Sequence, residues 1–142
     1  MYPRALQFIP FNEIEVFTTI RDIVVRIPDI SFTRSDGVAM PISCHLLTRA
    51  LAFVLPTLQV RDGFVGGTSY EHSWLITASK NIIDPYPMAG VGGPIMYDDI
   101  PLWKMFYGPE CCFLEHRAEE FRSWERTLNK GVEKIYNDLK NK

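Results

Sequence analysis

The segment SCHLLTRALAFVLP, residues 43–56, decides the fold of this chain. Ser43 is a favourable N-cap and Pro56 stops a helix, while the residues between them are apolar on most sides. A helix that is apolar nearly all round is buried at the centre of its domain. We therefore expect a buried central helix here, with the rest of the chain folded around it.

Short β-like runs follow this helix from Leu58 onward. They read LQV, GFVGG, HSWLIT and NIIDPYP, and they are separated by Asp-Gly, Gly-Gly and Ser-Lys-Asn turn signals. The Gly- and Pro-rich stretch 88–101 then reads as a loop with room for a short strand at 95–97. The pattern predicts a small antiparallel sheet.

Two amphipathic stripes flank the central helix and the strands. The first runs from Asn12 to Pro28, and Asn12 with Glu15 resembles a capping box at its start. Its apolar members are Ile14, Phe17, Ile20, Val24 and Ile27. The members of the second, C-terminal stripe are Leu114, Ala118, Phe121, Leu128, Val132, Ile135 and Leu139. The order helix, helix, strands, helix predicts an α+β fold with flanking N- and C-terminal helices.

The composition is that of one globular domain spanning residues 1–142, with 46% hydrophobic and 23% charged residues. A net charge of -2 gives no electrostatic reason to expect nucleic acid or an anionic membrane as a partner. No apolar run approaches the ~20 residues that span a bilayer, and the N-terminal stretch does not read as a signal peptide. Three cysteines, two of them adjacent, make a poor disulfide framework, so we expect reduced thiols and a cytoplasmic location.

Cys44 is the candidate nucleophile because it directly follows the predicted N-cap of the central helix. Unpaired N–H groups and the positive end of the helix dipole lower the pKa of a thiol at this position. The same N–H groups can hold a developing oxyanion. His72 opens one predicted strand and Asp84 closes the next, so the two side chains come within one or two residues of facing each other across a hairpin. This order supplies a thiol, a base and a group that orients the base.

The arrangement resembles the transglutaminase-like branch of the papain-like cysteine enzymes. The resemblance rests on SCHLLTRALAFVL, VRDGFVGG, YEHSWL and IIDPYP, and it covers roughly residues 43–87. It implies a nucleophile at Cys44, a base at His72 and an orienting acid at Asp84. It also implies chemistry on peptide or protein amides without a metal or other cofactor.

Three other readings stay open. Cys111, Cys112 and His116, with His45 or His72, form a weaker zinc hypothesis, because adjacent cysteines are poor ligand spacing. A papain-like frame can also serve as a non-catalytic binding or structural domain. The near-heptad spacing of the C-terminal stripe is compatible with a homodimer.

His45 follows Cys44 directly, and we expect its side chain to point about 100° away around the helix axis, so we do not expect His45 to be the base. The leading prediction is therefore a cysteine enzyme that forms an acyl-enzyme through Cys44, with His72 as its base. Water as the resolving nucleophile gives a peptidase, amidase or deamidase, and an amine gives an acyl transferase.

Overall fold

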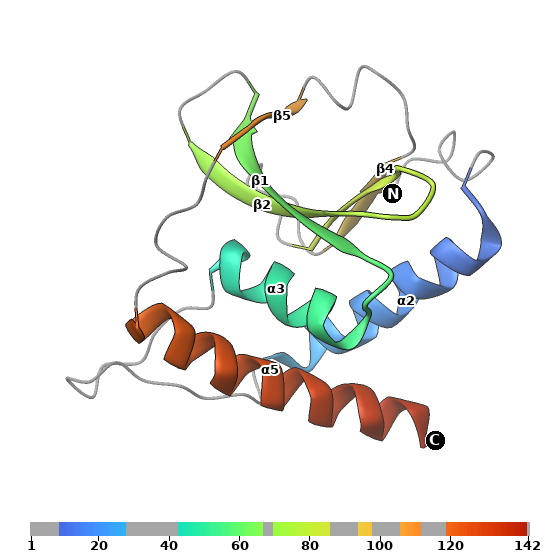
Figure 1. Ribbon diagram of the computed structural model, residues 1–142. Coiled ribbons are helices and arrows are strands. Elements are labelled where there is room, and N and C mark those ends of the chain that lie inside the picture. The colour runs from blue at the N-terminus through green and yellow to red at the C-terminus, as the bar shows by residue number, and fades with distance from the viewer. Residues whose placement is uncertain are drawn as a thin grey trace.

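The computed structural model describes residues 9–27, 43–66, 70–85, 94–97, 106–111 and 119–141. In this part of the chain three helices cover one face of a five-stranded antiparallel sheet, so the α+β class is as expected (Figure 1). The helices are α2 (Phe11–Val25), α3 (Cys44–Val54) and α5 (Glu119–Lys140). The strands are β1 (Gln59–Val65), β2 (Glu71–Ile76), β3 (Ile82–Asp84), β4 (Ile95–Tyr97) and β5 (Tyr107–Glu110).

Helix α3 begins where the sequence predicts. Ser43 is its N-cap, and the Ser43 hydroxyl accepts a hydrogen bond from the Leu46 N–H at 3.2 Å. The helix lies between the sheet and α5, as Figure 1 shows. Its residues Leu46, Leu47 and Leu51 are buried, whereas Phe53 is more than half exposed, so α3 is not buried on every side.

The first helix begins two residues earlier than the expected capping box requires. Pro10 is the N-cap of α2, no side chain caps the helix, and the carbonyl of Pro10 accepts from the N–H groups of Glu13 and Ile14. The prediction that Asn12 and Glu15 form a capping box is therefore wrong. Proline fixes its own φ near the value a helix entry needs, which explains why the helix begins directly after Pro10.

The sheet has the order β4-β3-β2-β1-β5. The Ser-Lys-Asn turn and the short strand at Ile95–Tyr97 are present as predicted, and Lys80 adopts a positive φ of 71° in the turn. The Asp-Gly pair is not a turn, because Asp62 and Gly63 lie inside β1. β2 and β5 both pair with β1 around these two residues, and this pairing on both sides overrides the local turn preference.

Strand β5 was not predicted. It is an edge strand of four residues, and it pairs Tyr107 with Val65 and Glu110 with Gly63. A register shift between Gly63 and Val65 marks an irregularity in this pairing. Its sequence, Tyr-Gly-Pro-Glu, lacks the apolar alternation that reveals a strand, and a proline is tolerated at a sheet edge.

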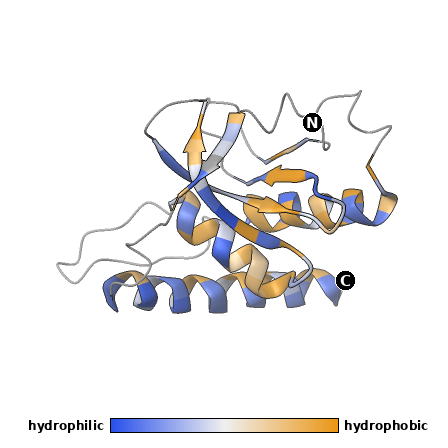
Figure 2. Cartoon of the chain, turned by 45° about the horizontal axis from the view of Figure 1, so that its top comes forward, coloured by the Kyte–Doolittle hydropathy of each residue, from blue (hydrophilic) through white to orange (hydrophobic). Residues whose placement is uncertain are grey.

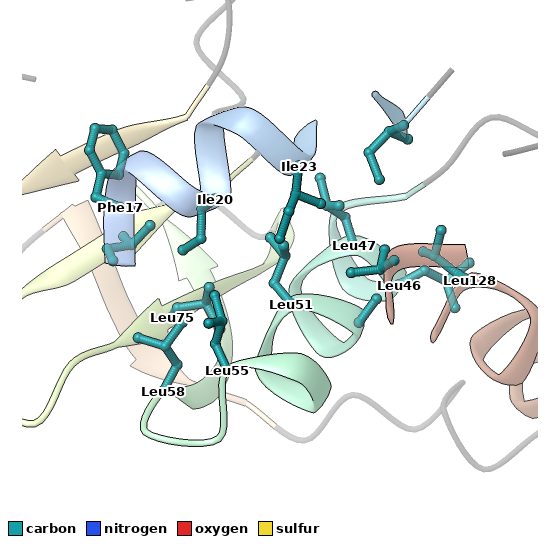
Figure 3. Close-up of a cluster of buried hydrophobic side chains, with 14 of the residues drawn as sticks. Phe17, Ile20, Ile23, Leu46, Leu47, Leu51, Leu55, Leu58, Leu75 and Leu128 are labelled. Atoms are coloured by element: carbon teal, nitrogen blue, oxygen red, sulfur yellow. The ribbon is translucent and has the colours of Figure 1, made fainter. Parts of the chain in front are cut away.

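One large apolar cluster joins all three helices to the inner face of the sheet. Phe17, Ile20 and Ile23 of α2 belong to the same cluster as Leu51 of α3 and Leu75 of β2, and Figure 3 labels these side chains. The C-terminal stripe reaches the same cluster through Phe121, Leu128, Val132 and Ile135, while Leu114 and Ala118 lie outside the described residues. Figure 2 shows that α5 turns its hydrophilic side away from α3. A homodimer through this helix stays a prediction.

A smaller cluster lies on the outer face of the sheet. It contains Trp74, Ile82, Ile95 and Tyr97, with Ile76 and Tyr107 packed against it. Side chains alternate between the faces of a strand. His72, two residues before Trp74, and Asp84, two residues after Ile82, therefore belong to this outer face as well. Among the described residues, no helix is long and apolar enough to cross a membrane.

Candidate functional site

The hairpin β2–β3 brings His72 and Asp84 together. The register pairs Leu75 with Ile83, so His72 lies two residues from the position opposite Asp84 and on the same face. The ring nitrogen Nε2 of His72 is 2.8 Å from Oδ2 of Asp84. Both side chains are shielded from solvent, with exposed fractions of 0% and 1%.

The surroundings of His72 favour its charged form. Burial opposes ionisation of the ring, but the hydrogen bond to Asp84, with smaller contributions from the Cys44 thiol, raises the pKa of His72 to about 9. The other ring nitrogen, Nδ1, is buried and makes no hydrogen bond of normal geometry within the described part of the chain. An imidazole held through one nitrogen leaves the other available for chemistry.

Cys44 is the group that faces this imidazole. It stands in the first turn of α3, is partly exposed, and is not part of a disulfide. Burial by itself raises the pKa of the thiol, but hydrogen bonding and positive charge from His45 and His72 bring the pKa down to about 6. A thiol with this pKa is largely thiolate at neutral pH, which is the nucleophilic form.

The start of α3 also offers a donor for an oxyanion. Ser43 already binds the N–H groups of Leu46 and Leu47, through its hydroxyl and its carbonyl. The backbone N–H of Cys44 makes no hydrogen bond with a described residue. An N–H at a helix N-terminus that no described group engages is suited to a negatively charged oxygen.

Tyr107 is a member of the site that the sequence did not reveal. Its hydroxyl donates a hydrogen bond of 2.9 Å to Oδ2 of Asp84, the same oxygen that His72 contacts. Burial, followed by the negative charge of Asp84, raises the pKa of Tyr107 above its usual range, so the hydroxyl keeps its proton. The ring stacks edge-on against Trp74 with centroids 5.3 Å apart. Only the pairing of β5 with β1 brings this residue to the site.

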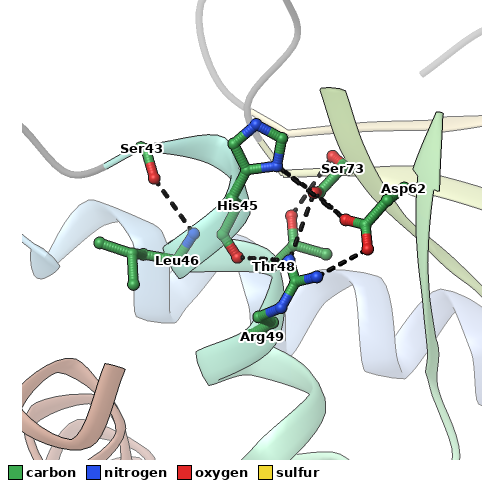
Figure 4. A network of polar contacts seen from close by, with 7 residues as sticks. All are labelled: Ser43, His45, Leu46, Thr48, Arg49, Asp62 and Ser73. Atoms are coloured by element: carbon green, nitrogen blue, oxygen red, sulfur yellow. Dashed lines mark hydrogen bonds and ion pairs between the residues drawn. The ribbon is translucent and has the colours of Figure 1, made fainter. Parts of the chain in front are cut away.

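His45 interacts with both the candidate thiol and the sheet. Its ring interacts with the Cys44 thiol, which the 100° separation of neighbouring residues on a helix does not by itself predict. The reason is the position of Ser73, whose hydroxyl lies 2.6 Å from Nδ1 of His45 and draws the ring toward the sheet (Figure 4). No local sequence pattern indicates this contact, because it depends on how α3 packs against β2.

The structure describes only some of the residues of the zinc hypothesis. The described residues contain no group of three or more His, Cys, Asp or Glu side chains that could hold a metal ion. Cys111 is described and is not disulfide-bonded, while Cys112 and His116 lie outside the described residues.

Comparison of the chain with protein-family models, curated proteins and solved structures gave no significant match.

Proposed function

We propose that this protein is a cysteine-nucleophile enzyme that acts on amide bonds, with a papain-like, transglutaminase-like arrangement of its site. The observation that carries the proposal is the buried imidazole of His72. One of its nitrogens is held by Asp84, the other makes no hydrogen bond of normal geometry within the described structure, and the ring interacts with the Cys44 thiol. The nucleophile is Cys44, the base is His72, and Asp84 orients the base.

The chemistry follows from the charges at the site. The Cys44 thiolate forms a bond to the carbonyl carbon of an amide, and the carbonyl oxygen takes up the negative charge beside the Cys44 N–H. The C–N bond then breaks, and the His72 imidazolium gives its proton to the leaving amine. Water or a second amine attacks the acyl-enzyme, loses a proton to the now neutral His72, and releases the thiolate. No cofactor takes part in these steps.

The substrate class in this proposal is a peptide or protein amide. Hydrolysis makes the protein a peptidase, amidase or deamidase, and attack by an amine makes it an acyl transferase. The pKa values of about 6 for Cys44 and about 9 for His72 set the pH range in which the thiolate–imidazolium pair exists. Activity is expected to rise as pH passes about 6 and to fall as pH passes about 9.

A second candidate function is a binding or structural domain with the same frame. One observation favours it, namely that His72 and Asp84 are fully shielded from solvent and form a buried ion pair. Such a pair can fix a fold without taking part in a reaction. In that case the Cys44 thiol has no need to be ionised at neutral pH.

The experiment that separates the two functions is the pH profile of Cys44 alkylation by iodoacetamide, located by mass spectrometry, in the wild type and in His72→Ala. The enzyme proposal expects half-maximal labelling near pH 6, because the folded state lowers the pKa of this thiol to about 6. Removing the imidazolium should move the midpoint upward by about one unit or more. Cys111 and Cys112 serve as internal comparisons on the same chain.

A midpoint near the ~8.5 of a free thiol, unchanged in His72→Ala, contradicts the assignment of Cys44 as an activated nucleophile. Circular dichroism of both proteins shows whether the variant is folded. A folded His72→Ala protein whose Cys44 still reacts at the wild-type pH contradicts the role of His72.

A further inference from the structure

A second histidine–carboxylate network lies on the inner face of the sheet, on the opposite side of β2 from His72. Asp62 of β1 and Ser73 of β2 are direct partners in the antiparallel register. The Ser73 hydroxyl donates to Oδ1 of Asp62 at 2.5 Å and lies 2.6 Å from Nδ1 of His45. Figure 4 shows these side chains converging from α3 and from the two strands.

The direction of the hydrogen bonds fixes the tautomer of His45. A hydroxyl has a single proton, and the proton of Ser73 is directed to the carboxylate of Asp62. Nδ1 of His45 must therefore donate to the Ser73 oxygen. With Nδ1 carrying a hydrogen, Nε2 is the nitrogen that gains or loses the second proton.

Arg49 anchors the far end of this network. Its Nη2 donates to Oδ2 of Asp62 at 2.6 Å, and its Nη1 donates to the His45 carbonyl oxygen at 3.1 Å. His45 and Arg49 are four residues apart on α3, so both side chains leave the same face of the helix. The carboxylate between them is thus held on both oxygens, and the His45 ring has little freedom to turn away.

The charges around the thiol balance when both imidazoles are protonated. Arg49, His45 and His72 supply three positive charges, and Asp62, Asp84 and the Cys44 thiolate supply three negative ones. Shielded charges are stable when each has an opposite partner. With only one imidazole protonated, these groups would carry one uncompensated negative charge beside the sulfur.

We propose that Cys44 is served by two imidazoles, and that His45, held by Ser73 and Asp62, is a second catalytic histidine that stays protonated through the cycle. The inference rests on the proposed function. His72 becomes neutral once its proton has left with the amine. A positive charge on His45 then still stabilises the sulfur, so the C–S bond of the acyl-enzyme breaks more easily when water or an amine attacks.

The pKa shifts agree with this role. Burial opposes ionisation of His45, but its link to Asp62 and the nearby thiol raise its pKa to about 9. The titratable groups that face His45 in the described structure are Cys44 and Arg49 on its own helix and Asp62 on β1. The positive charge is therefore present at neutral pH and is lost as pH rises through about 9.

The test is a titration of the Cys44 thiolate by its ultraviolet absorbance in the full chain, with Cys44→Ser as the baseline. The variants are His45→Gln, His72→Gln and the double variant, each checked for folding by circular dichroism. Glutamine keeps a hydrogen-bonding group without the charge. Each single variant should raise the thiol pKa by about one unit or more, and the double variant should bring it near that of a free thiol, ~8.5.

The possible outcomes separate the two proposals. A shift in His72→Gln but none in His45→Gln overturns the second histidine and leaves the proposed function standing. A shift in His45→Gln alone supports the second histidine and overturns the role given to His72. No shift in either variant overturns both.

Ser73→Ala provides an independent check if His45→Gln does not fold, because it removes the hydroxyl that bridges His45 and Asp62 while leaving every charged group in place. It should raise the thiol pKa less than His45→Gln does. A purely structural role of this network predicts a lower melting temperature in Ser73→Ala with an unchanged thiol pKa, which would overturn the inference.

Discussion

At the scale of single residues, one carboxylate oxygen organises the outer face of the sheet. Oδ2 of Asp84 is within hydrogen-bond distance of both His72 and the Tyr107 hydroxyl. The two groups reach Asp84 from β2 and β5, which are not neighbours in the sheet. Asp84 therefore connects the imidazole to a strand that the hairpin alone does not include.

Replacing Tyr107 by phenylalanine tests this connection. Tyr107→Phe removes a donor from a buried carboxylate, so the free energy of unfolding should fall by about 1–3 kcal/mol. The carboxylate of Asp84 then has one hydrogen-bond donor fewer, so it stabilises the charged form of His72 more strongly. The pKa of His72 should therefore rise further. Denaturant unfolding and an NMR titration of the His72 ring protons measure the two effects.

Tyr70→Phe, at an exposed tyrosine, is the control. A loss of stability in Tyr107→Phe without any change in the His72 titration would mean that the hydroxyl stabilises the fold but does not influence the imidazole.

The sequence indicates Cys44, His72 and Asp84 because their chemistry and their order along the chain can be read without coordinates. The structure adds Tyr107, His45 and the Asp62–Ser73 pair, and none of these has such a signal. Their positions depend on how β1 aligns with its two neighbours, and a shift of one residue would turn each strand side chain to the other face. Strand register is set by the whole sheet, so these residues could not be identified from local patterns.

At the scale of elements, Glu13 connects the start of α2 to the turn between β2 and β3. Its carboxylate accepts hydrogen bonds from the Asn81 side chain at 2.9 Å and from the Ser79 N–H at 3.2 Å. Burial opposes ionisation of Glu13, but hydrogen bonds from Thr77, Ser79 and Asn81 outweigh it and lower the pKa of this carboxyl. The turn that positions Asp84 relative to His72 is thus held by a helix distant in sequence.

Glu13→Ala should lower the free energy of unfolding by about 1–3 kcal/mol at neutral pH, because it leaves the buried Asn81 amide without its acceptor. The pKa of Glu13 is lower in the folded state than in the unfolded state. Its contribution to stability is therefore present at pH values above the ordinary pKa of a glutamate and is lost as pH falls through the folded pKa. Urea unfolding at neutral and at acidic pH should show the difference from wild type shrinking with acid.

The matched control is Glu15→Ala, two residues along the same helix and exposed. Equal losses of stability in the two variants would show that the loss of a negative charge near the start of α2, rather than the contact with the turn, causes the effect.

The elements themselves divide into those with and those without a local signal. The helices at Phe11–Val25 and Glu119–Lys140 follow from apolar stripes, and the start of α3 follows from Ser43. Two predictions are wrong: the capping box at Asn12, where the helix instead begins after Pro10, and the turn at Asp62-Gly63, where strand β1 continues. Local capping and turn preferences are weak next to tertiary pairing.

At the scale of the whole molecule, α3 is the element that the core is built around. Leu51 has an exposed fraction of 0% and belongs to the cluster that joins all three helices to the sheet. Phe53, two residues later on the same helix, has an exposed fraction of 55%. Leu51 and Phe53 therefore allow the effect of burial on stability to be compared within one helix.

Leu51→Ala should lower the free energy of unfolding by about 2–5 kcal/mol, the range for removing a buried leucine side chain. Phe53→Ala removes more atoms and should cost less than about 1 kcal/mol, because most of its side chain already contacts solvent. Thermal or denaturant unfolding of the two variants measures both values. A larger loss in Phe53→Ala would mean that the outer side of α3 is covered by another surface.

The order of the strands has a consequence for how the site comes together in time. Strands β1 to β4 are neighbours in the sheet in the order of their synthesis, so His72 and Asp84 can meet across a hairpin as soon as that hairpin leaves the ribosome. Strand β5 and helix α5 must instead return across the chain to β1 and α3, and such long-range closures are slower. We therefore expect the imidazole–carboxylate pair to form before Tyr107 reaches it, and the apolar side of α3 to be covered last, when α5 packs against it.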